Sequence, residues 1–509
     1  MIGSQNIFAR AVMGAMAGLS IASFGAPADA AGLYVSERGV RPLGRGGAFV
    51  AGADDLGAIV YNPAGLADVG KSFLVDATYV HFTSEYTRRT VVRQTDPNTG
   101  ETISEGVQTF APVQGSAPFI PIPTLAASFV PSDKWTVAFG LWVPYVGIAS
   151  YPDKVNGQAA PQRYSLLSLG GSALAVAGGY ASYKISPTLR VGAGVELLAG
   201  FFKSTVAFSG CVPDKFFCAP EQSDWDVNAE LNVGPIVAPS GNAGAIWIPH
   251  PKVRVGLSGH LPFWVRSTAT IKTRLPSAAP FATARQEGDE ADVAFDMPWN
   301  LRAGVEARPV EKLRLEAALG YEGWGVHDSI RVDPRGVALK NVVGFPETYY
   351  IPSVNLPRQF QGAFSVRLGG EYRIPVGKAQ LDLRAGVGFE TSAVPNEYVS
   401  VLTIDSNKIT PTVGASLTVR DAIRFDMVVA DAFYFSQDVD PKKAKIGQVS
   451  PVVANPSPNP NIINGGTYST NALMVGFGFA YVFGAPPAAP APAPAAEKTD
   501  KTEKTKSPD

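Results

Sequence analysis

The stretch that decides the fold reads Leu313-Arg314-Leu315-Glu316-Ala317-Ala318-Leu319-Gly320-Tyr321-Glu322. Apolar residues alternate along it with charged or small ones, and a period of two places the two sets on opposite faces of a β-strand. The same alternation recurs in residues 189–197, 364–372 and 381–390, where one face stays apolar for about nine residues. A tilted strand needs roughly 9–11 residues to cross a bilayer. The pattern therefore predicts transmembrane strands whose apolar face meets lipid.

The last such stretch carries a large apolar face opposite small residues, formed by Val475, Phe477, Phe479, Tyr481 and Phe483. This stretch alone is ambiguous, because a soluble sandwich also has strands with one large apolar face. The alternative fold is a secreted two-sheet assembly with long loops. It does not readily explain strands of this length or an aromatic final strand.

Short and long connections alternate strictly between these strands. The six short turn signals are Pro131–Lys134, Ser186–Thr188, Pro249–Lys252, Arg308–Lys312, Pro375–Lys378 and Arg420–Ala422. The seven long polar connections are residues 88–120, 148–162, 209–225, 271–289, 332–358, 394–407 and 438–469. Transmembrane barrels have short periplasmic turns and long outer loops, and lipid cannot satisfy a free sheet edge. We therefore predict an all-β fold, a 14-stranded antiparallel transmembrane β-barrel over residues 71–484.

Composition excludes several other classes. The 43 basic and 44 acidic residues give a net charge of −1, which argues against nucleic acid as a partner. Charged residues are 17% and hydrophobic residues 46%, which argues against a largely disordered chain. Outside the N-terminus no run of 18 apolar residues occurs, so a multispan helical membrane protein is excluded.

The two ends of the chain differ from the barrel region. Residues 1–30 resemble a secretory signal, with Arg10, the apolar run Ala11–Phe24 and a cleavage site after Ala30. An N-terminal anchor helix is the alternative, but the apolar run is short and rich in glycine. Residues 485–509 combine a Pro/Ala tract with mixed charges. They predict a disordered periplasmic tail, which either touches the cell wall or is a passive appendage.

The sequence shows no set of catalytic residues and no cofactor motif. The four histidines are scattered, and Gly256–Gly259 lacks the spacing of a nucleophile elbow, so we expect no enzyme activity. The two cysteines, Cys211 and Cys218, lie close together in a polar segment, which predicts a disulfide in an oxidising compartment. A metal pair is the alternative, but no histidine lies nearby in sequence to complete it. We expect neither metal nor cofactor.

Residues 31–70 do not alternate. They contain Gly44, Gly46, Gly47 and the turn signal Asn62-Pro63, and small residues permit close backbone packing. No strand precedes the glycines and no Gly-Lys-Ser/Thr follows, so they are not a phosphate loop. A compact segment of this kind before a barrel predicts a plug, or hatch, inside the lumen.

The sequence resembles the outer-membrane long-chain fatty acid transporters, the FadL-type family that includes aromatic-hydrocarbon uptake proteins. The resemblance covers nearly all of residues 31–484 and is carried by Ser36–Gly39, Leu43–Ala48, Ala53-Asp54-Asp55, Tyr61–Leu66, Gly241–Ala245, Val253–Leu257 and Leu383–Val387. It implies fourteen strands, a hatch, and a lateral opening through a kinked third strand. Asn62-Pro63-Ala64 match the family's hatch motif, so we expect them, with Asp54 and Asp55, to take part in hatch gating.

The third strand, predicted over Trp135–Gly147, contains Pro144. Proline lacks the N–H that a sheet ladder needs. Pro144 and Gly147 are therefore candidates for the lateral opening. The alternative is that Pro144 only ends the strand at the rim.

Four arginines lie one residue into strands that follow short turns, with side chains expected inside the barrel near the periplasm: Arg190, Arg254, Arg314 and Arg424. Inward acids accompany them, namely Glu196, Glu316, Glu371, Asp382 and Asp426. One interpretation is a charge-paired ring that holds the hatch. The other is a site for a substrate carboxylate, which arginine binds through two hydrogen bonds.

The function that this predicts is passive uptake of hydrophobic molecules, most of all long-chain fatty acids, across the outer membrane of a Gram-negative bacterium. Trp142 and Trp324 are candidate ligand-lining residues, or alternatively outward interface anchors. The expected partners are a hydrophobic small molecule and membrane lipid, and we expect a monomer. Aromatic hydrocarbons are the alternative ligands. A general porin without a hatch and a barrel lipase with a Ser/His pair are the alternative functions.

Overall fold

The computed structural model describes residues 38–95, 102–117, 119, 121–145, 149–212, 215–219, 221–452 and 460–484. The expected signal peptide (1–30), the first residues of the expected hatch (31–37), Gly147 and the expected tail (485–509) lie outside the described residues.

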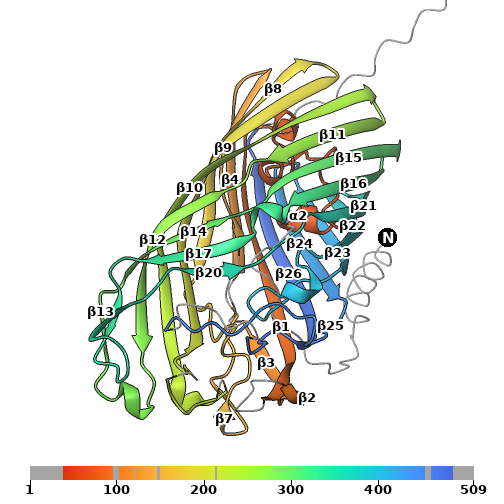
Figure 1. Cartoon of the computed structure of the whole chain (residues 1–509). Helices are drawn as coiled ribbons and strands as arrows, with labels where there is room; N and C mark the ends of the chain where they lie inside the picture. Colours follow the sequence, from red (N-terminus) through yellow and green to blue (C-terminus); the bar gives the residue numbers. More distant parts are fainter. Residues whose placement is uncertain are drawn as a thin grey trace, which may run out of the picture.

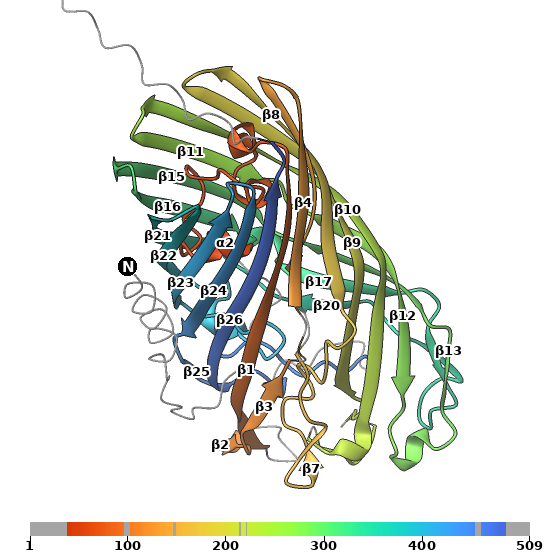
Figure 2. The ribbon, with the colours of Figure 1, turned by 180° about the vertical axis from the view of Figure 1, so that it is seen from behind.

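Within the described residues, fourteen antiparallel strands close into one barrel, as the alternation predicted (Figures 1 and 2). Nine of these strands are continuous: β1 (Ser72–Thr95), β4 (Pro121–Ser132), β5 (Trp135–Tyr145), β8 (Ala173–Ser186), β9 (Leu189–Ser209), β10 (Asp226–His250), β22 (Ala379–Glu390), β23 (Lys408–Val419) and β26 (Gly466–Val482). The ring closes because β1 pairs with β26 on one side and with β4 on the other.

The other five strands in the described part of the chain are each interrupted once. They are β11 (Val253–His260) with β12 (Trp264–Arg274), β14 (Glu290–Asp296) with β15 (Trp299–Val310), β16 (Leu313–Gly323) with β17 (Ser329–Pro334), β20 (Val354–Pro357) with β21 (Ala363–Val376), and β24 (Ile423–Tyr434) with β25 (Gln437–Val439). Buried aromatic side chains lie at these interruptions, among them Phe263 and Trp324. The sequence analysis did not predict these breaks.

The face assignment from the two-residue period is confirmed. In β16 the side chains of Leu315 and Leu319 are exposed, whereas those of Arg314 and Glu316 are buried. Leucine that is exposed around the outside of a closed barrel meets lipid in an outer membrane. All six predicted short turns join consecutive barrel strands: β4–β5, β8–β9, β10–β11, β15–β16, β21–β22 and β23–β24.

The predicted long connections contain more strand than expected, which corrects their boundaries. β1 continues past residue 88 to Thr95, and pairs with β2 (Thr102–Thr109) and β3 (Val113–Ser116). Short strands also form within other connections: β6 (Lys154–Val155), β7 (Gln158–Ala159), β13 (Arg285–Glu287), β18 (Ala338–Lys340) and β19 (Thr348–Tyr350). Backbone N–H and C=O groups need partners beyond the membrane too, and hairpins supply them although the sequence there is polar.

The N-terminal segment forms short helices: α2 (Val40–Leu43), α3 (Ala58–Tyr61) and the 3₁₀-helix η1 (Pro63–Asp68). Further 3₁₀ turns lie outside it, namely η2 (Ser223–Trp225), η3 (Ala279–Phe281), η4 (Trp324–Val326) and η5 (Asn396–Tyr398). Among the described residues, no helix has the length and apolar character needed to cross a bilayer. The main apolar core joins Phe49, Ile59 and Leu66 of the N-terminal segment to inward side chains of the barrel.

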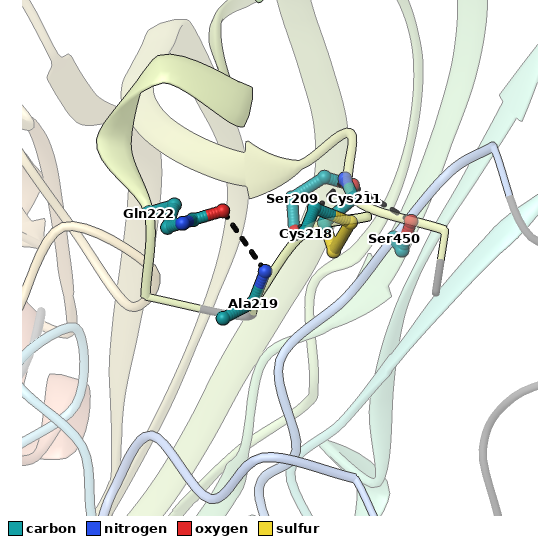
Figure 3. Close-up of a disulfide and its surroundings, with 6 residues drawn as sticks. All are labelled: Ser209, Cys211, Cys218, Ala219, Gln222 and Ser450. Carbon is teal, nitrogen blue, oxygen red and sulfur yellow. Dashed lines mark hydrogen bonds between the residues drawn. A yellow bond between two sulfur atoms is a disulfide. The ribbon is translucent and has the colours of Figure 1, made fainter. Parts of the chain in front are cut away.

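A disulfide joins Cys211 to Cys218 in the connection between β9 and β10, with 5.9 Å between the Cα atoms (Figure 3). The backbone N–H of Cys211 donates to Ser209 Oγ at 3.2 Å. Ser450 Oγ donates to the Ser209 carbonyl at 2.7 Å, so this connection also contacts the one that precedes β26.

Candidate functional site

The N-terminal segment 38–70 lies against the inward faces of the barrel strands, where α2 appears enclosed by them (Figures 1 and 2). The approach is closest at Arg45-Gly46. A Cβ atom on Gly369 would lie 2.0 Å from the Arg45 carbonyl oxygen, and one on Gly386 would lie 2.4 Å from the Arg45 carbonyl carbon. Gly46 itself has φ +63°, a left-handed conformation that favours glycine. Glycine on both sides is therefore what lets the segment pack so closely on β21 and β22.

Asn62 of the predicted hatch motif joins three pieces of backbone. Its Nδ2 donates to the Val50 carbonyl at 2.9 Å and to the Ala245 carbonyl of β10 at 3.2 Å. Its Oδ1 accepts from the Ala64 N–H at 3.1 Å, which caps η1, and Pro63 occupies the first position of that helix. Asn62 thus fixes the fold of the segment and its contact with the barrel wall.

The four predicted lumen arginines all form ion pairs with acidic residues of the N-terminal segment. Arg190 pairs with Asp68 at 3.1 Å, and Arg254 pairs with the other oxygen of the same carboxylate. Arg314 pairs with Asp54 at 2.7 Å, and Arg424 pairs with Asp55 at 2.7 Å. This geometry favours a ring that holds the segment over a site for a substrate carboxylate, because a substrate would have to displace these acids.

The inward acids divide between this ring and other partners. Glu316 accepts from the backbone N–H groups of Val50, Ala51 and Gly52 at 2.7–3.0 Å. Glu371 pairs with three arginines: Arg41, Arg314 and Arg384. Asp426 pairs with Arg424, and Asp382 with Arg373. Glu196 lies elsewhere and bonds to Tyr180, Asn242 and His260.

Sequence reasoning missed part of this cluster, namely Arg41, Arg45, Asp68 and Glu306. Arg45 is fully buried, and its Nη2 lies 3.1 Å from Glu306 and 3.0 Å from Glu316. Strand parity could have placed Glu306 inside the barrel, since it alternates with apolar residues in β15. No local signal marks Arg41, Arg45 or Asp68, because the segment that carries them has no period.

The register of β5 is irregular at the predicted proline. β5 pairs regularly with β8 up to Trp142–Val176, and the register then shifts before Tyr145–Leu174. The ladder between β4 and β5 ends at Thr124–Trp142. Arg38 of the N-terminal segment reaches this point. Its Nε donates to the Val143 carbonyl at 3.3 Å and its Nη2 to the Pro144 carbonyl at 3.1 Å.

Among the cavities that the described residues line, three share lining residues and a fourth lies beside them. A cavity of about 1070 Å³, partly continuous with solvent, is lined mainly by apolar side chains of β9, β10, β12, β17 and β20. It shares Phe202, Leu231 and Ile330 with a second cavity of about 530 Å³. That one shares Met297 and His327 with a third cavity, of about 620 Å³.

The fourth cavity, of about 320 Å³, is lined by Arg38, Trp142 and Pro144 and so adjoins the β5 irregularity. Phe263 also lines it, and the Phe263 carbonyl accepts from the Met297 N–H at 2.9 Å, next to the second and third cavities. Trp142 is 4% exposed and Trp324, which lines the third cavity, is 7% exposed. Both indoles therefore lie inside the barrel, and the alternative of outward interface anchors is wrong.

The cavity of about 1070 Å³ is lined by a single charged side chain among the described residues, that of Arg358, which sequence reasoning did not single out. Arg358 lies between β20 and β21, beyond the 14 residues of β21 that suffice to cross the membrane. Burial without a nearby carboxylate lowers the pKa of its guanidinium to about 10. It is therefore still charged at neutral pH.

The described residues contain no group of three or more side chains suited to hold a metal ion. Two histidines inside the barrel are hydrogen-bonded, His260 to the Glu196 carboxylate and His327 to the Asp296 carbonyl.

Comparisons with known proteins agree with this geometry. Residues 21–484 match the family model described as outer membrane protein transport protein (OMPP1/FadL/TodX). A search of curated proteins found no match. Among solved structures, the chain is similar to a Pseudomonas aeruginosa FadL homologue, with TM-score 0.66 and 14% identity over 89% of this chain and 100% of that one. The Pseudomonas putida toluene transporter TodX gives TM-score 0.60 and 16% identity over 89% and 99%. The CymD monoaromatic hydrocarbon channel gives a TM-score of 0.52 and 15% identity over 89% of this chain and 98% of that one. At these identities the structural likeness shows the fold alone.

Proposed function

The chain belongs to this family of outer-membrane transport proteins, and on that basis we propose that it works by hatch-gated lateral uptake. The family is one of transport channels and not of enzymes. The protein is a β-barrel transporter of hydrophobic compounds in a Gram-negative outer membrane. Ligand binds in the apolar cavity on the loop side, passes inward, and leaves sideways into the bilayer near Pro144. The single observation that supports the proposal is a row of cavities. Three of them share lining residues, and the fourth lies at the irregularity in β5, where its lining residue Phe263 is hydrogen-bonded to Met297 of the second and third cavities.

Apolar burial supplies the affinity along this route, at about 0.8 kcal/mol per buried CH₂ group. A sideways exit keeps the solute out of the aqueous periplasm, where its apolar surface would be hydrated again. All four cavities lie within one chain, so a monomer holds the whole route. The partners that we propose are a hydrophobic small molecule and outer-membrane lipid.

Residues 31–70 act as the hatch in this proposal. The arginine ring holds it through Asp54, Asp55 and Asp68, and Asn62 fixes its fold. At its other end Arg38 covers the irregular carbonyls of β5, so a movement of the hatch would release Val143 and Pro144. In this proposal, movement of the hatch and opening of the exit in β5 are therefore coupled through Arg38.

Long-chain fatty acids are the ligands that we propose first. The cavity of about 1070 Å³ is apolar over most of its lining, as sites for hydrophobic ligands are. Aromatic hydrocarbons are the second candidate, supported by the titles of two similar structures, a toluene transporter and a monoaromatic hydrocarbon channel. A general porin is disfavoured because hydrophilic solutes need a wet passage, whereas the N-terminal segment packs against the strands here.

The test is uptake by cells that lack other transporters of this kind and express the full chain. Pro144→Val restores the N–H that the ladder needs, and we expect it to slow uptake of palmitate or toluene roughly tenfold, about 1.4 kcal/mol of added barrier. Pro375→Val, at an exposed short turn, is the matched control. If Pro144→Val and Asn62→Ala both leave uptake at the wild-type rate, the lateral mechanism is excluded.

A further inference from the structure

The rim formed by the six short turns carries an excess of positive charge. Besides the four lumen arginines, eight basic residues lie in these turns or within two residues of them: Lys134, Lys184, Lys252, Arg308, Lys312, Arg373, Lys378 and Arg420. The exposed acidic residues of the turns are Asp133, Glu311 and Asp421. In the described part of the chain none of these three acids forms an ion pair, so the turns do not neutralise their own cations.

These eight cations face each other in four pairs across neighbouring strands. In three pairs the backbone N–H of one basic residue donates to the carbonyl of the other: Lys184 to Lys134 at 2.9 Å, Arg308 to Lys252 at 2.8 Å, and Arg373 to Lys312 at 2.8 Å. The fourth pair, Lys378 and Arg420, comes directly after the last pair of the ladder between β22 and β23, Ala379 with Val419. The register of the barrel therefore places like charges opposite each other at four places around one rim.

Two of the four pairs are partly compensated by an acid. Arg308 pairs with Glu306 at 2.9 Å, and Arg373 pairs with Asp382 at 3.2 Å. In both cases the acid belongs to the lumen face of a strand, and only one of the two cations contacts it.

The other two pairs have no compensation within the described residues. No hydrogen bond or ion pair is formed there by the side chains of Lys134, Lys184, Lys378 or Arg420. Like charges directly opposite each other destabilise a pair of strands. An anion from outside would remove this repulsion, and a phosphate group fits best because its oxygens can accept from two cations at once.

The rim lies at the level of lipid head groups. Trp135, which follows Lys134, is 46% exposed, and its ring centroid lies 4.7 Å from that of Tyr183, which precedes Lys184. Outward aromatic residues of this kind form the girdle of a membrane barrel at the head-group level. One residue of strand spans about 3.3 Å, so the cations lie within reach of the phosphates. Short turns of such barrels face the periplasm, so these phosphates belong to the periplasmic leaflet.

We infer that the rim of short turns binds anionic phospholipids of the periplasmic leaflet, and that each opposed pair of cations holds one head-group phosphate. Phosphatidylglycerol fits because its head group has one net negative charge. The ammonium group of phosphatidylethanolamine would place a third cation beside each pair. This inference does not depend on the proposed uptake route, and it holds for any ligand of the lumen.

The test is native mass spectrometry of the full chain in detergent, titrated with phosphatidylglycerol or with phosphatidylethanolamine. We expect the wild type to bind up to four molecules of phosphatidylglycerol more tightly than phosphatidylethanolamine. The double variant Lys134→Gln, Lys184→Gln should lose one of these sites, with affinity there lowered roughly 10- to 30-fold. Lys134→Arg with Lys184→Arg keeps both charges, and we expect wild-type binding.

The matched control removes two cations on the other side of the membrane. Lys443 and Lys445 are exposed and lie in the connection between β25 and β26. We expect the double variant Lys443→Gln, Lys445→Gln to bind both lipids as the wild type does. Inorganic phosphate, compared with chloride at equal ionic strength, is a competitor that should not displace the lipid, because the acyl chains keep the head group at the rim.

The outcomes decide the inference without any uptake measurement. Equal affinity of the wild type for the two lipids overturns it, and so does unchanged binding of phosphatidylglycerol by Lys134→Gln, Lys184→Gln. An equal loss in the Lys443, Lys445 control shows a general effect of charge and overturns the assignment to the rim. Displacement by inorganic phosphate shows that the pairs take the free ion, and overturns the assignment to lipid.

Discussion

The two halves of the lumen are built on opposite principles. Near the short turns the N-terminal segment fills the lumen, and the buried charged groups there form ion pairs. Glu371, for example, contacts three arginines. On the loop side lies an apolar cavity of about 1070 Å³, and the guanidinium that lines it, that of Arg358, has no partner in the described residues. The difference is that charge in the first half holds the N-terminal segment to the barrel, whereas the second half leaves an apolar space, which the proposed function assigns to the ligand.

Removal of the filled half is expected to have the largest effect. Deletion of residues 38–70 leaves a barrel without its lumen segment, and barrels of slightly larger strand number enclose an aqueous channel. We expect single-channel conductance in planar bilayers to rise roughly tenfold or more. If the deletion variant has the same conductance as the intact chain, the N-terminal segment does not block the lumen. The protein would then be a general porin, and the two halves of the lumen would not differ as described.

Loss of one shared acid comes next. Glu371→Gln leaves Arg41 and Arg384 with uncompensated charge in a buried site, and breaking a buried pair costs about 3–5 kcal/mol. We expect a lower free energy of unfolding by that amount in urea titrations followed by tryptophan fluorescence. Glu105→Gln removes an acid of an exposed pair with Lys442 and is the control, for which we expect no measurable change.

The boundary between the halves is tested by Arg38→Met. It leaves the carbonyls of Val143 and Pro144 without their donor, at a cost of about 1–3 kcal/mol. We expect faster amide hydrogen exchange in β5 beside the irregularity, and, under the proposed gating, faster uptake. Arg302→Met removes a donor to the Val60 carbonyl in the same region, and β5 should then exchange as in the wild type. Unchanged exchange in Arg38→Met would show that the hatch and β5 are not coupled.

The smallest effect is expected at the outer connections. The disulfide closes a loop with a sequence separation of 7, so its loss costs about 2.4 kcal/mol of loop-closure entropy, and the effect is confined to the connection between β9 and β10. We expect the Cys211→Ser, Cys218→Ser double variant to be cut faster by added protease near residues 209–225, with uptake close to the wild-type rate. A large loss of uptake would instead place this connection in the route of the ligand.

The strands were predictable because their signal is local. Leu315, Leu319, Arg314 and Glu316 lie on the faces that alternation assigned to them, and the six short turns lie where Pro, Gly and charged residues cluster. The interruptions at Phe263 and Trp324 were not predictable, because burial of these side chains depends on what they pack against in the lumen. Neither were the partners of the lumen arginines, since Asp54, Asp55 and Asp68 are far from them in sequence.

The sequence by itself determined the closed barrel, its fourteen strands and the side of each strand that meets lipid, because a period of two and the alternation of connections are read one strand at a time. Only the tertiary structure decided which buried charged groups form ion pairs and which one has no partner. Pairing in the lumen joins residues as far apart as Arg41 and Glu371, and whether Arg358 has a neighbour is a matter of distance across the barrel, which no sequence period encodes.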